Sequence, residues 1–262
     1  MATSTESPYF STSVSRVAPG EVGIRGYDLR DIIKKATFSE AIFLTLRGRR
    51  PTSPELAVFD AIMCSCIDHG FVNALAVTAR YAMSGSGFLP AGVAAGILAA
   101  GKHTAMPQRV AAMLLELGAD DPEAVSDAAV VERVKSIAAA GERVPGLGHP
   151  LHRAIDPRSV AVREVATSVG ADQRYLALLE RVQAAVESTS NRRLVLNVDG
   201  MMASLLTAMG FEPDEMLAVN ILAAAPGIAA QTIEEGLHGV PLRIVRDYDV
   251  EYQLPATPKT WS

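Results

Sequence analysis

Apolar residues recur at helical spacing along most of this 262-residue chain. In residues 172–187, DQRYLALLERVQAAVE, five of them fall on one face of a helix. They are Tyr175, Leu178, Leu179, Val182 and Val186. A repeat that continues through a chain requires a fold in which helices bury their apolar faces against each other. Only 5% of the residues are aromatic and Ala and Leu dominate, which also favours helices over strands.

Start and stop signals divide the chain into roughly ten helices. One helix is predicted from Ser53-Pro54-Glu55 to Gly70, and another from Asp121-Pro122 to Gly141. Further helices are expected near 70–83, 90–101, 107–118, 158–168, 198–209 and 213–235. Only residues 242–254 show some β character, and the first seventeen residues are interpreted as a loose arm. The sequence therefore predicts an all-α protein.

Composition and charge exclude several classes of protein. The formal net charge of -5 argues against a nucleic-acid binder, and no signal-peptide pattern is present. The uncharged run between Arg80 and Lys102 is broken by SGSG and Pro90, so we expect core helices and no membrane span. Cys64 and Cys66 point in different directions on a helix, so they are expected to be two buried, unpaired thiols. These features predict a soluble, cytoplasmic protein.

Polar residues interrupt the apolar pattern in four places. They are His69 in IDHGFVNA, His103 in AGKHTAMP, His149 and Arg158 in VPGLGHPLHRAIDPR, and Asp199 in LVLNVDGMM. Desolvation raises the pKa of a carboxyl group in apolar surroundings toward the range of a general base. Two imidazoles and a carboxylate together are suited to proton transfer next to a carbonyl, with the imidazoles stabilising an enolate oxygen.

Each of these residues also has a purely structural interpretation. Asp199 could cap the helix that follows it, and His69 and His103 could interact with the dipole at a helix C-terminus. Arg158 could cap a helix or form a salt bridge. Two further histidines are expected to be solvated or structural: His152 and His238.

Four ordered segments resemble the citrate synthases and the related citryl-CoA lyases. Residues 25–56 resemble the family's RGYD segment, and DHGFVNALAVTAR (68–80) is similar to its DH-x-x-N-A segment. VPGLGHPLHRAIDPR (144–158) resembles its P-G-x-G-H and D-P-R segment, and NVDG (197–200) resembles its N-V-D. The resemblance covers nearly the whole chain in the right order.

The resemblance assigns roles to individual residues. His103 matches the histidine that stabilises the enolate of acetyl-CoA, and His149 matches the one facing the oxaloacetate carbonyl. Asp199 matches the base at the acetyl methyl carbon. Arg158 and His69 match residues that contact the dicarboxylate. The backbone that matches the coenzyme A loop is formed by Val144, Pro145, Gly146, Leu147 and Gly148.

Three departures from the family pattern concern the site. The histidine segment AGKHTAMP lacks the family's flanking glycines, and Pro150 stands where bacterial citrate synthases usually carry Arg. Val240-Pro241 replaces the family's R-P carboxylate clamp, for which Arg243 or Arg246 could substitute. The short length, LNVDG and the ending GLHGVPLRIVRDYDVEYQLP look more like citryl-CoA lyases and the lyase module of ATP-citrate lyase.

The resemblance implies cleavage of (3S)-citryl-CoA to acetyl-CoA and oxaloacetate. His149 would take up the hydroxyl proton, His103 would hold the thioester enolate, and protonated Asp199 would return a proton to carbon. No metal and no tightly bound cofactor are implied, since coenzyme A is part of the substrate. The alternatives are a citrate synthase or related acyl-CoA/2-keto acid condensing enzyme, and a non-catalytic family member that binds a CoA ester.

The family's architecture implies two helical domains and a symmetric assembly. A large domain is expected from residues 1–103 and 216–262, and a small domain from 104–215 closes over the site. Closure would exclude water from the enolate. We expect a homodimer or a higher even oligomer, with a small-molecule CoA thioester and a dicarboxylate as ligands and no nucleic acid or membrane as partner.

Overall fold

The chain, in a computed structural model, is described over residues 9–101, 103–104, 106–118, 121–254, 257 and 259–260. These residues form eleven α-helices, two short 3₁₀ helices and a small sheet, so the predicted, mostly helical fold is confirmed. The helices are α1 (Leu29–Lys35), α2 (Phe38–Arg47), α3 (Ser53–Ser65), η1 (Gly70–Val72), α4 (Ala74–Ser86), α5 (Leu89–Leu98), α6 (Pro107–Gly118), α7 (Asp127–Ala139), α8 (Pro157–Ser168), α9 (Arg174–Ser190), α10 (Val198–Ala208), α11 (Pro213–His238) and η2 (Asp247–Asp249).

Helix starts follow local capping chemistry. Thr52 and Glu55 form a capping box at α3, where the predicted proline lies in the first turn. The predicted start of α7 at Asp121-Pro122 is wrong, because Asp121 accepts a hydrogen bond from the Glu123 backbone in a turn (3.0 Å). The helix begins six residues later, where the Ser126 hydroxyl caps it.

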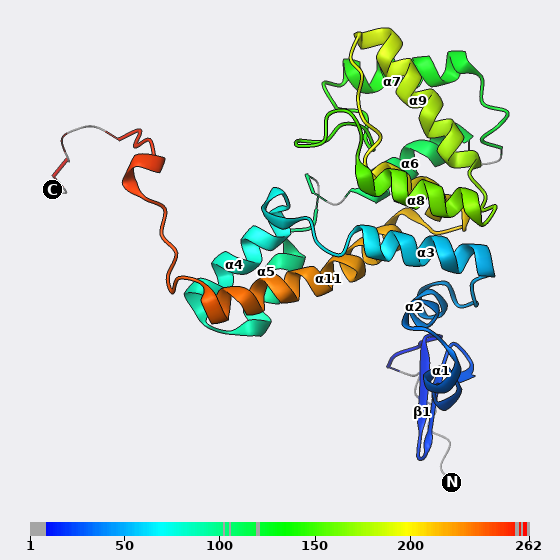
Figure 1. Cartoon of the computed structure of the whole chain (residues 1–262), viewed down its shortest axis with the longest axis horizontal. Helices are drawn as coiled ribbons and strands as arrows, with labels where there is room; N and C mark the ends of the chain where they lie inside the picture. Colours follow the sequence, from blue (N-terminus) through cyan, green and yellow to red (C-terminus); the bar gives the residue numbers. More distant parts are fainter. Residues whose placement is uncertain are drawn as a thin grey trace.

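The sheet lies near the N-terminal end, where no strand was predicted. Strands β1 (Ser15–Ala18), β2 (Glu21–Ile24) and β3 (Tyr27–Asp28) form an antiparallel meander beside α1 (Figure 1). The predicted loose arm therefore ends before Ser15, and its first eight residues lie outside the described part of the chain. These strands are short and largely exposed, so they lack the alternation of apolar and polar residues that identifies a strand.

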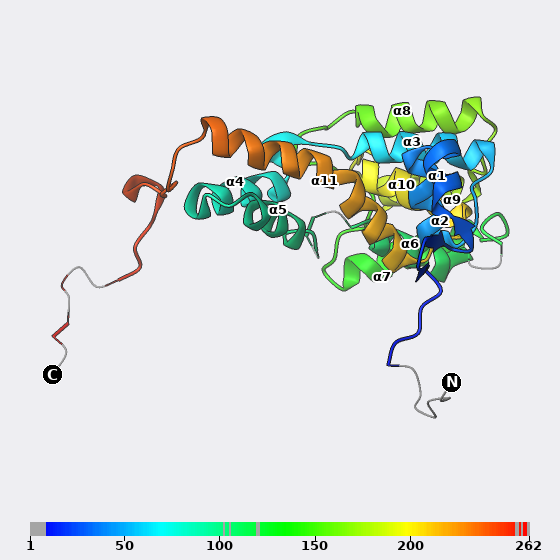
Figure 2. The ribbon, with the colours of Figure 1, turned by 90° about the horizontal axis from the view of Figure 1, so that it is seen from below.

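The β character of residues 242–254 does not produce a strand. This fully described segment contains only η2 and runs away from the helices (Figure 2). A strand is stabilised by pairing with a neighbour. β-Branched composition without a partner strand is therefore insufficient here.

Two apolar cores hold the helices together. The larger core contains side chains of α2, α3 and α6–α10 and of the first half of α11, and the rings of Phe43, Phe59 and Phe211 pack together in it. The smaller core joins α4, α5 and the second half of α11 through Leu75 and Ile228. The domain division at residues 103/104 and 215/216 stays a prediction.

Helix α11 contributes side chains to both cores. By length and composition alone it could cross a membrane. It packs against α3, α4, α5 and α6. Its apolar character is that expected of a helix shared by two cores.

A close contact on α11 places the loop that carries His69. A Cβ atom on Gly227 would lie only 2.0 Å from the Ile67 carbonyl oxygen, so the loop after α3 passes directly over this glycine. The Gln231 amide also donates a hydrogen bond to Asp68 (2.9 Å). These contacts hold His69 at one wall of a cleft.

Candidate active site

A cleft of about 540 Å³ is lined by residues of both cores and of the loops between them. Every residue predicted for the site lines this cleft. They are His69, His103, Val144, Pro145, Gly146, Leu147, Gly148, His149, Arg158 and Asp199. Positions up to 130 residues apart in the sequence are therefore brought to one place.

The loop 144–148 is held by hydrogen bonds to the segment before α10. The Gly148 N–H donates to the Val195 carbonyl (2.6 Å), and the Asn197 N–H donates to the Gly146 carbonyl (3.0 Å). The Asn197 side chain also donates to the Gly148 carbonyl (2.9 Å). The loop is therefore fixed through its main chain, which is the part expected to lie along coenzyme A.

Glycines permit this close approach. Gly146 and Gly148 both have a φ of +82°, in the left-handed region. A Cβ on Gly146 would lie 3.0 Å from the Gly200 Cα, so the loop nearly touches the first turn of α10. This contact sets the position of His149, at the end of the loop, relative to Asp199 on the helix.

Asp199 lies in the first turn of α10 and accepts a hydrogen bond from the Met106 N–H (3.2 Å). The cap of this helix is Asn197, whose side chain accepts from the Gly200 N–H (3.0 Å). The capping interpretation of Asp199 is therefore wrong. Burial raises the pKa of Asp199, although the Met106 hydrogen bond and the Arg158 charge act in the opposite direction. A carboxyl with a raised pKa is suited to giving and taking a proton.

The tautomer of His149 follows from its backbone contacts. Its Nδ1 accepts hydrogen bonds from the N–H groups of Leu151 (3.1 Å) and His152 (2.9 Å). The hydrogen of the neutral ring must then lie on Nε2, which is 3.1 Å from Nε2 of His69. His149 therefore donates, and Nε2 of His69 accepts.

Both of these rings are neutral near pH 7. Burial lowers the pKa of His149, and the neighbouring His152 and Arg158 lower it further. Burial also lowers the pKa of His69, followed by the effect of Arg158. The pair therefore offers one N–H donor and one lone pair at the same place.

Arg158 is fixed by Asp156 in a salt bridge, which is one of the structural interpretations that the sequence left open. Nε and Nη2 of Arg158 donate to the two carboxylate oxygens at 3.0 and 2.7 Å. Asp156 also accepts from the backbone N–H groups of Arg158 (3.1 Å) and Val198 (3.2 Å). Burial would raise the pKa of Asp156, but the hydrogen bonds and charge of Arg158 outweigh burial and lower it.

Arg158 and His149 converge on one point. Nη2 of Arg158 lies 3.3 Å from Nε2 of His149, and both atoms carry hydrogens. Among the residues that the structure describes, no hydrogen-bond partner occupies Nη1 of Arg158. Donors that face a common point bind an oxygen atom, and a carboxylate satisfies them best.

His103 lies in a tight turn in which Gly101 and Thr104 pair through backbone hydrogen bonds of 3.0 and 3.1 Å. Its side chain is exposed at the cleft. Helix α5 ends at Leu98, so His103 is not a last-turn residue, and interaction with that dipole does not explain it.

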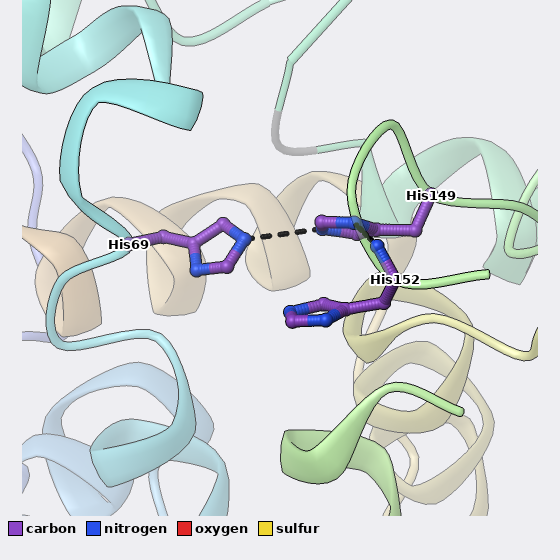
Figure 3. Close-up of side chains that lie close together, drawn as sticks. All are labelled: His69, His149 and His152. Atoms are coloured by element: carbon purple, nitrogen blue, oxygen red, sulfur yellow. Dashed lines mark hydrogen bonds between the residues drawn. The ribbon is translucent and has the colours of Figure 1, made fainter. Parts of the chain in front are cut away.

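His152 is not among the residues that line the cleft, but it lies beside His149 and His69, and sequence analysis assigned it no role there. Its half-buried ring lies 4.4 Å from the His149 ring and 5.6 Å from the His69 ring, centroid to centroid. Figure 3 shows the three side chains converging from two loops. The sequence feature that could have identified His152 as a site residue is its spacing, three residues after His149 in the same motif.

The three histidines have ligand atoms within 4.8 Å of one another, as a metal site would. The Arg158 guanidinium lies beside Nε2 of His149 and would repel a divalent cation bound there. The charge of the surroundings therefore favours an anion.

The two cysteines differ from the prediction of two buried thiols. Cys64 is exposed, whereas Cys66 is partly buried and lines the cleft; neither forms a disulfide. Burial raises the pKa of the Cys66 thiol to about 11. Cys66 therefore stays protonated and is not a nucleophile at neutral pH.

Neither arginine proposed as a substitute clamp lines the cleft. Arg243 donates two hydrogen bonds to the buried Glu235 (2.6 and 2.8 Å), which also accepts from Arg80 (3.0 Å). Arg246 stacks on Tyr248 in the exposed C-terminal segment. Within the described part of this chain, Arg158 is the arginine whose guanidinium lies within hydrogen-bond distance of His149.

Comparisons with solved structures place the fold. Over 97% of this chain and 98% of the other, it superposes on citryl-CoA lyase from Hydrogenobacter thermophilus with a TM-score of 0.86 and 29% identity. It also superposes on a mutant ATP citrate lyase of Methanosaeta concilii in complex with (3S)-citryl-CoA, with a TM-score of 0.83 and 17% identity, over 96% of this chain and 42% of that one. The second likeness shows the fold alone.

Sequence relatives carry the citrate synthase name. The chain is 30% identical over 210 residues to the putative citrate synthase 2 of Mycobacterium bovis, which covers 78% of this chain and 54% of that protein. It is 26% identical to citrate synthase 2 of Bacillus subtilis over 215 residues, or 80% and 55% of the two chains. The chain thus spans about half the length of these relatives. Residues 46–246 match the family model described as citrate synthase, C-terminal domain. Because this match covers more than half of the sequence, the chain belongs to the citrate synthase family.

Proposed function

We propose that this chain is a citryl-CoA lyase that cleaves (3S)-citryl-CoA to acetyl-CoA and oxaloacetate. The observation that carries the proposal is the superposition on a citryl-CoA lyase over nearly the full length of both chains. The cleft adds chemical support, since it combines donors for a carboxylate, a lone pair for a hydroxyl proton and a carboxyl with a raised pKa.

We assign different roles in proton transfer to His149 and His69 because of their hydrogen bonds. In cleavage, the citryl C3 hydroxyl loses its proton, the bond from C3 to the CH₂ of the thioester arm breaks, and C3 becomes the carbonyl of oxaloacetate. Nδ1 of His149 is occupied by backbone donors, so its Nε2–H donates to the C3 oxygen and cannot take the proton. The lone pair on Nε2 of His69, 3.1 Å away, accepts it. This revises the expectation that His149 takes up the hydroxyl proton.

The CH₂ group that separates from C3 becomes the terminal carbon of the acetyl-CoA enolate. In the proposal, the His103 ring donates a hydrogen bond to the enolate oxygen, and protonated Asp199 gives its proton to the terminal carbon. Burial of Asp199 favours its protonated form, which this step requires. The main chain of residues 144–148 would lie along coenzyme A, which enters as part of the substrate, and no tightly bound cofactor is included.

The second candidate is a citrate synthase or a related condensing enzyme, favoured by the names of the sequence relatives. A substrate panel separates the two. Initial rates are measured with citryl-CoA, and with acetyl-CoA or propionyl-CoA plus several 2-keto acids. The proposal predicts the highest rate with citryl-CoA. Faster condensation, with a free tricarboxylic acid as product, would replace the lyase with a synthase.

A non-catalytic member that binds a CoA ester would turn over no substrate in the panel. Calorimetric titration with coenzyme A then identifies it: binding without turnover of any member of the panel supports this alternative over both enzymes.

We also propose a homodimer or higher even oligomer in the cytoplasm. Large apolar side chains are exposed on α5 and α11, including Leu98 (82% exposed) and Leu237 (70% exposed). The extended segment 239–254 adds further exposed apolar residues (Figure 2). Light scattering of the purified chain tests the assembly, and a monomer at micromolar concentration would contradict it.

A further inference from the structure

The feature that the proposed mechanism leaves unused is His152. Its ring lies nearly parallel to the ring of His149, with an interplanar angle of 30° and a centroid separation of 4.4 Å. Its ring nitrogens have no hydrogen-bond partner among the described residues, and a ligand nitrogen lies within 4.8 Å of those of His69 and His149. Figure 3 shows it beside the His69–His149 pair. The ring therefore has unused hydrogen-bonding capacity next to the expected substrate position.

Hydrogen-bond donors at this place outnumber the acidic groups that could accept from them. Arg158 joins the three histidines, and the carboxylate beside them is Asp156. Both of its oxygens are already engaged by Arg158 and by backbone donors. The donors left over are complementary to an anionic ligand that comes from outside the chain.

The substrate needs more carboxylate contacts than one arginine provides. Citryl-CoA keeps two free carboxylates at the end that becomes oxaloacetate. Three arginines line the cleft, but Arg109 forms an ion pair with Glu142, and Arg143 directly precedes the expected coenzyme A loop. Among the described residues, Arg158 is the arginine with a guanidinium nitrogen within hydrogen-bond distance of one of these histidines (3.3 Å, to His149), and Arg243 is held by Glu235.

We propose that His152 is a substrate-binding residue that donates a hydrogen bond to one carboxylate of the dicarboxylate end, while Arg158 binds the other. The inference rests on the proposed function for the identity of the ligand. It gives this chain a route to dicarboxylate recognition in which an imidazole adds to Arg158, the arginine that lies within hydrogen-bond distance of the cluster.

Two substitutions separate substrate contact from packing. His152→Phe keeps a flat ring that can stack on His149 but removes the hydrogen-bond donor. His152→Gln removes the ring but keeps a donor of similar reach. The exposed His238, at the end of α11, gives a matched control, His238→Gln.

The experiment measures the Kd for oxaloacetate and for coenzyme A by calorimetry, and the KM and kcat for citryl-CoA. His152→Phe is expected to weaken oxaloacetate binding and raise the citryl-CoA KM by about tenfold, the loss of one hydrogen bond to a charged group. His152→Gln should stay within a few-fold of wild type. The coenzyme A Kd and all His238→Gln values should not change.

The opposite pattern overturns the proposal. If His152→Phe binds oxaloacetate like wild type while His152→Gln does not, the ring acts only by packing on His149. Equal losses of oxaloacetate and coenzyme A binding would also mean a structural role. If the wild-type chain binds oxaloacetate but does not cleave citryl-CoA, the lyase assignment is wrong. The oxaloacetate Kd values of His152→Phe and His152→Gln then still test the role of His152. A wild-type chain that does not bind oxaloacetate removes the His152 proposal as well.

Discussion

The ring of His149 accepts hydrogen bonds from two backbone N–H groups, whereas the ring of His103, in the same cleft, is exposed and has no hydrogen-bond partner among the described residues. The loop before His149 is also tied to the segment that precedes α10. The side of the site around His149 and the loop expected to lie along coenzyme A is therefore organised before any ligand binds. The side around His103 has no such contacts among the described residues, and in the proposed mechanism closure would order it around the ligand.

Asp199 connects the two sides and should give the largest effect. It lies on α10 next to the fixed loop, and it binds Met106, close to the His103 turn. Asp199→Asn keeps the shape but cannot give a proton to carbon, so we expect kcat for citryl-CoA cleavage to fall about 10²–10⁴-fold. Unchanged activity in a steady-state assay would show that the proposed proton donor is wrong.

The same substitution should raise stability. Burial raises the pKa of Asp199, so its stabilising contribution is complete below the unfolded-state pKa and is lost as pH rises through the folded-state pKa. Asp199→Asn removes the buried charge, and its Tm should exceed that of wild type at pH 8. The difference should shrink toward pH 4 in thermal melts. A lower Tm for the variant across this range would mean that burial does not disfavour the charged form of Asp199.

Replacing the two histidines separately tests the comparison itself. His103→Phe keeps a flat ring without a donor, so it should lower kcat about 10²–10³-fold, the effect of losing one donor to an enolate-like oxygen, and leave the oxaloacetate Kd unchanged. His149→Phe, which also lacks a donor, should lower kcat and in addition weaken oxaloacetate binding. Calorimetry and steady-state kinetics on both variants decide this. If His103→Phe weakens oxaloacetate binding as much as His149→Phe does, the two sides are not distinct.

Two glycines of the fixed loop offer a matched pair. Alanine at either position adopts a left-handed φ at a cost of about 1–2 kcal/mol. At Gly146 the new Cβ would also lie 3.0 Å from the Gly200 Cα, whereas at Gly148 the nearest atom is 3.9 Å away. Gly146→Ala should therefore lower the free energy of unfolding more than Gly148→Ala, measured by urea titration. Equal losses would show that the loop does not press against α10.

Acidification should give the smallest effect. The pKa values of His69 and His149 are lowered in the folded protein, so the unfolded chain binds protons first as pH falls below about 6.5. The Tm should fall between pH 7 and pH 5.5, and His69→Gln should make this fall less steep. Scanning fluorimetry checks both, and an equally steep fall in the variant would place the cause elsewhere.

The sequence predicted the features that depend on local pattern. Apolar spacing located most helices, and the motif residues line one cleft, although their catalytic roles remain predictions. The exposed strands β1–β3 lack a burial pattern and could not be recognised. The contact of His152 with His149 depends on the path of the loop, and the exposure of Cys64 depends on which helix face is covered.

The most direct test is to identify the products of citryl-CoA. The wild-type chain is incubated with (3S)-citryl-CoA, oxaloacetate is followed by its reduction with malate dehydrogenase and NADH, and free citrate is quantified in the same sample. The proposed lyase releases oxaloacetate and acetyl-CoA in equal amounts without free citrate, and Asp199→Asn suppresses both products. Accumulation of free citrate and coenzyme A in place of oxaloacetate would contradict the account.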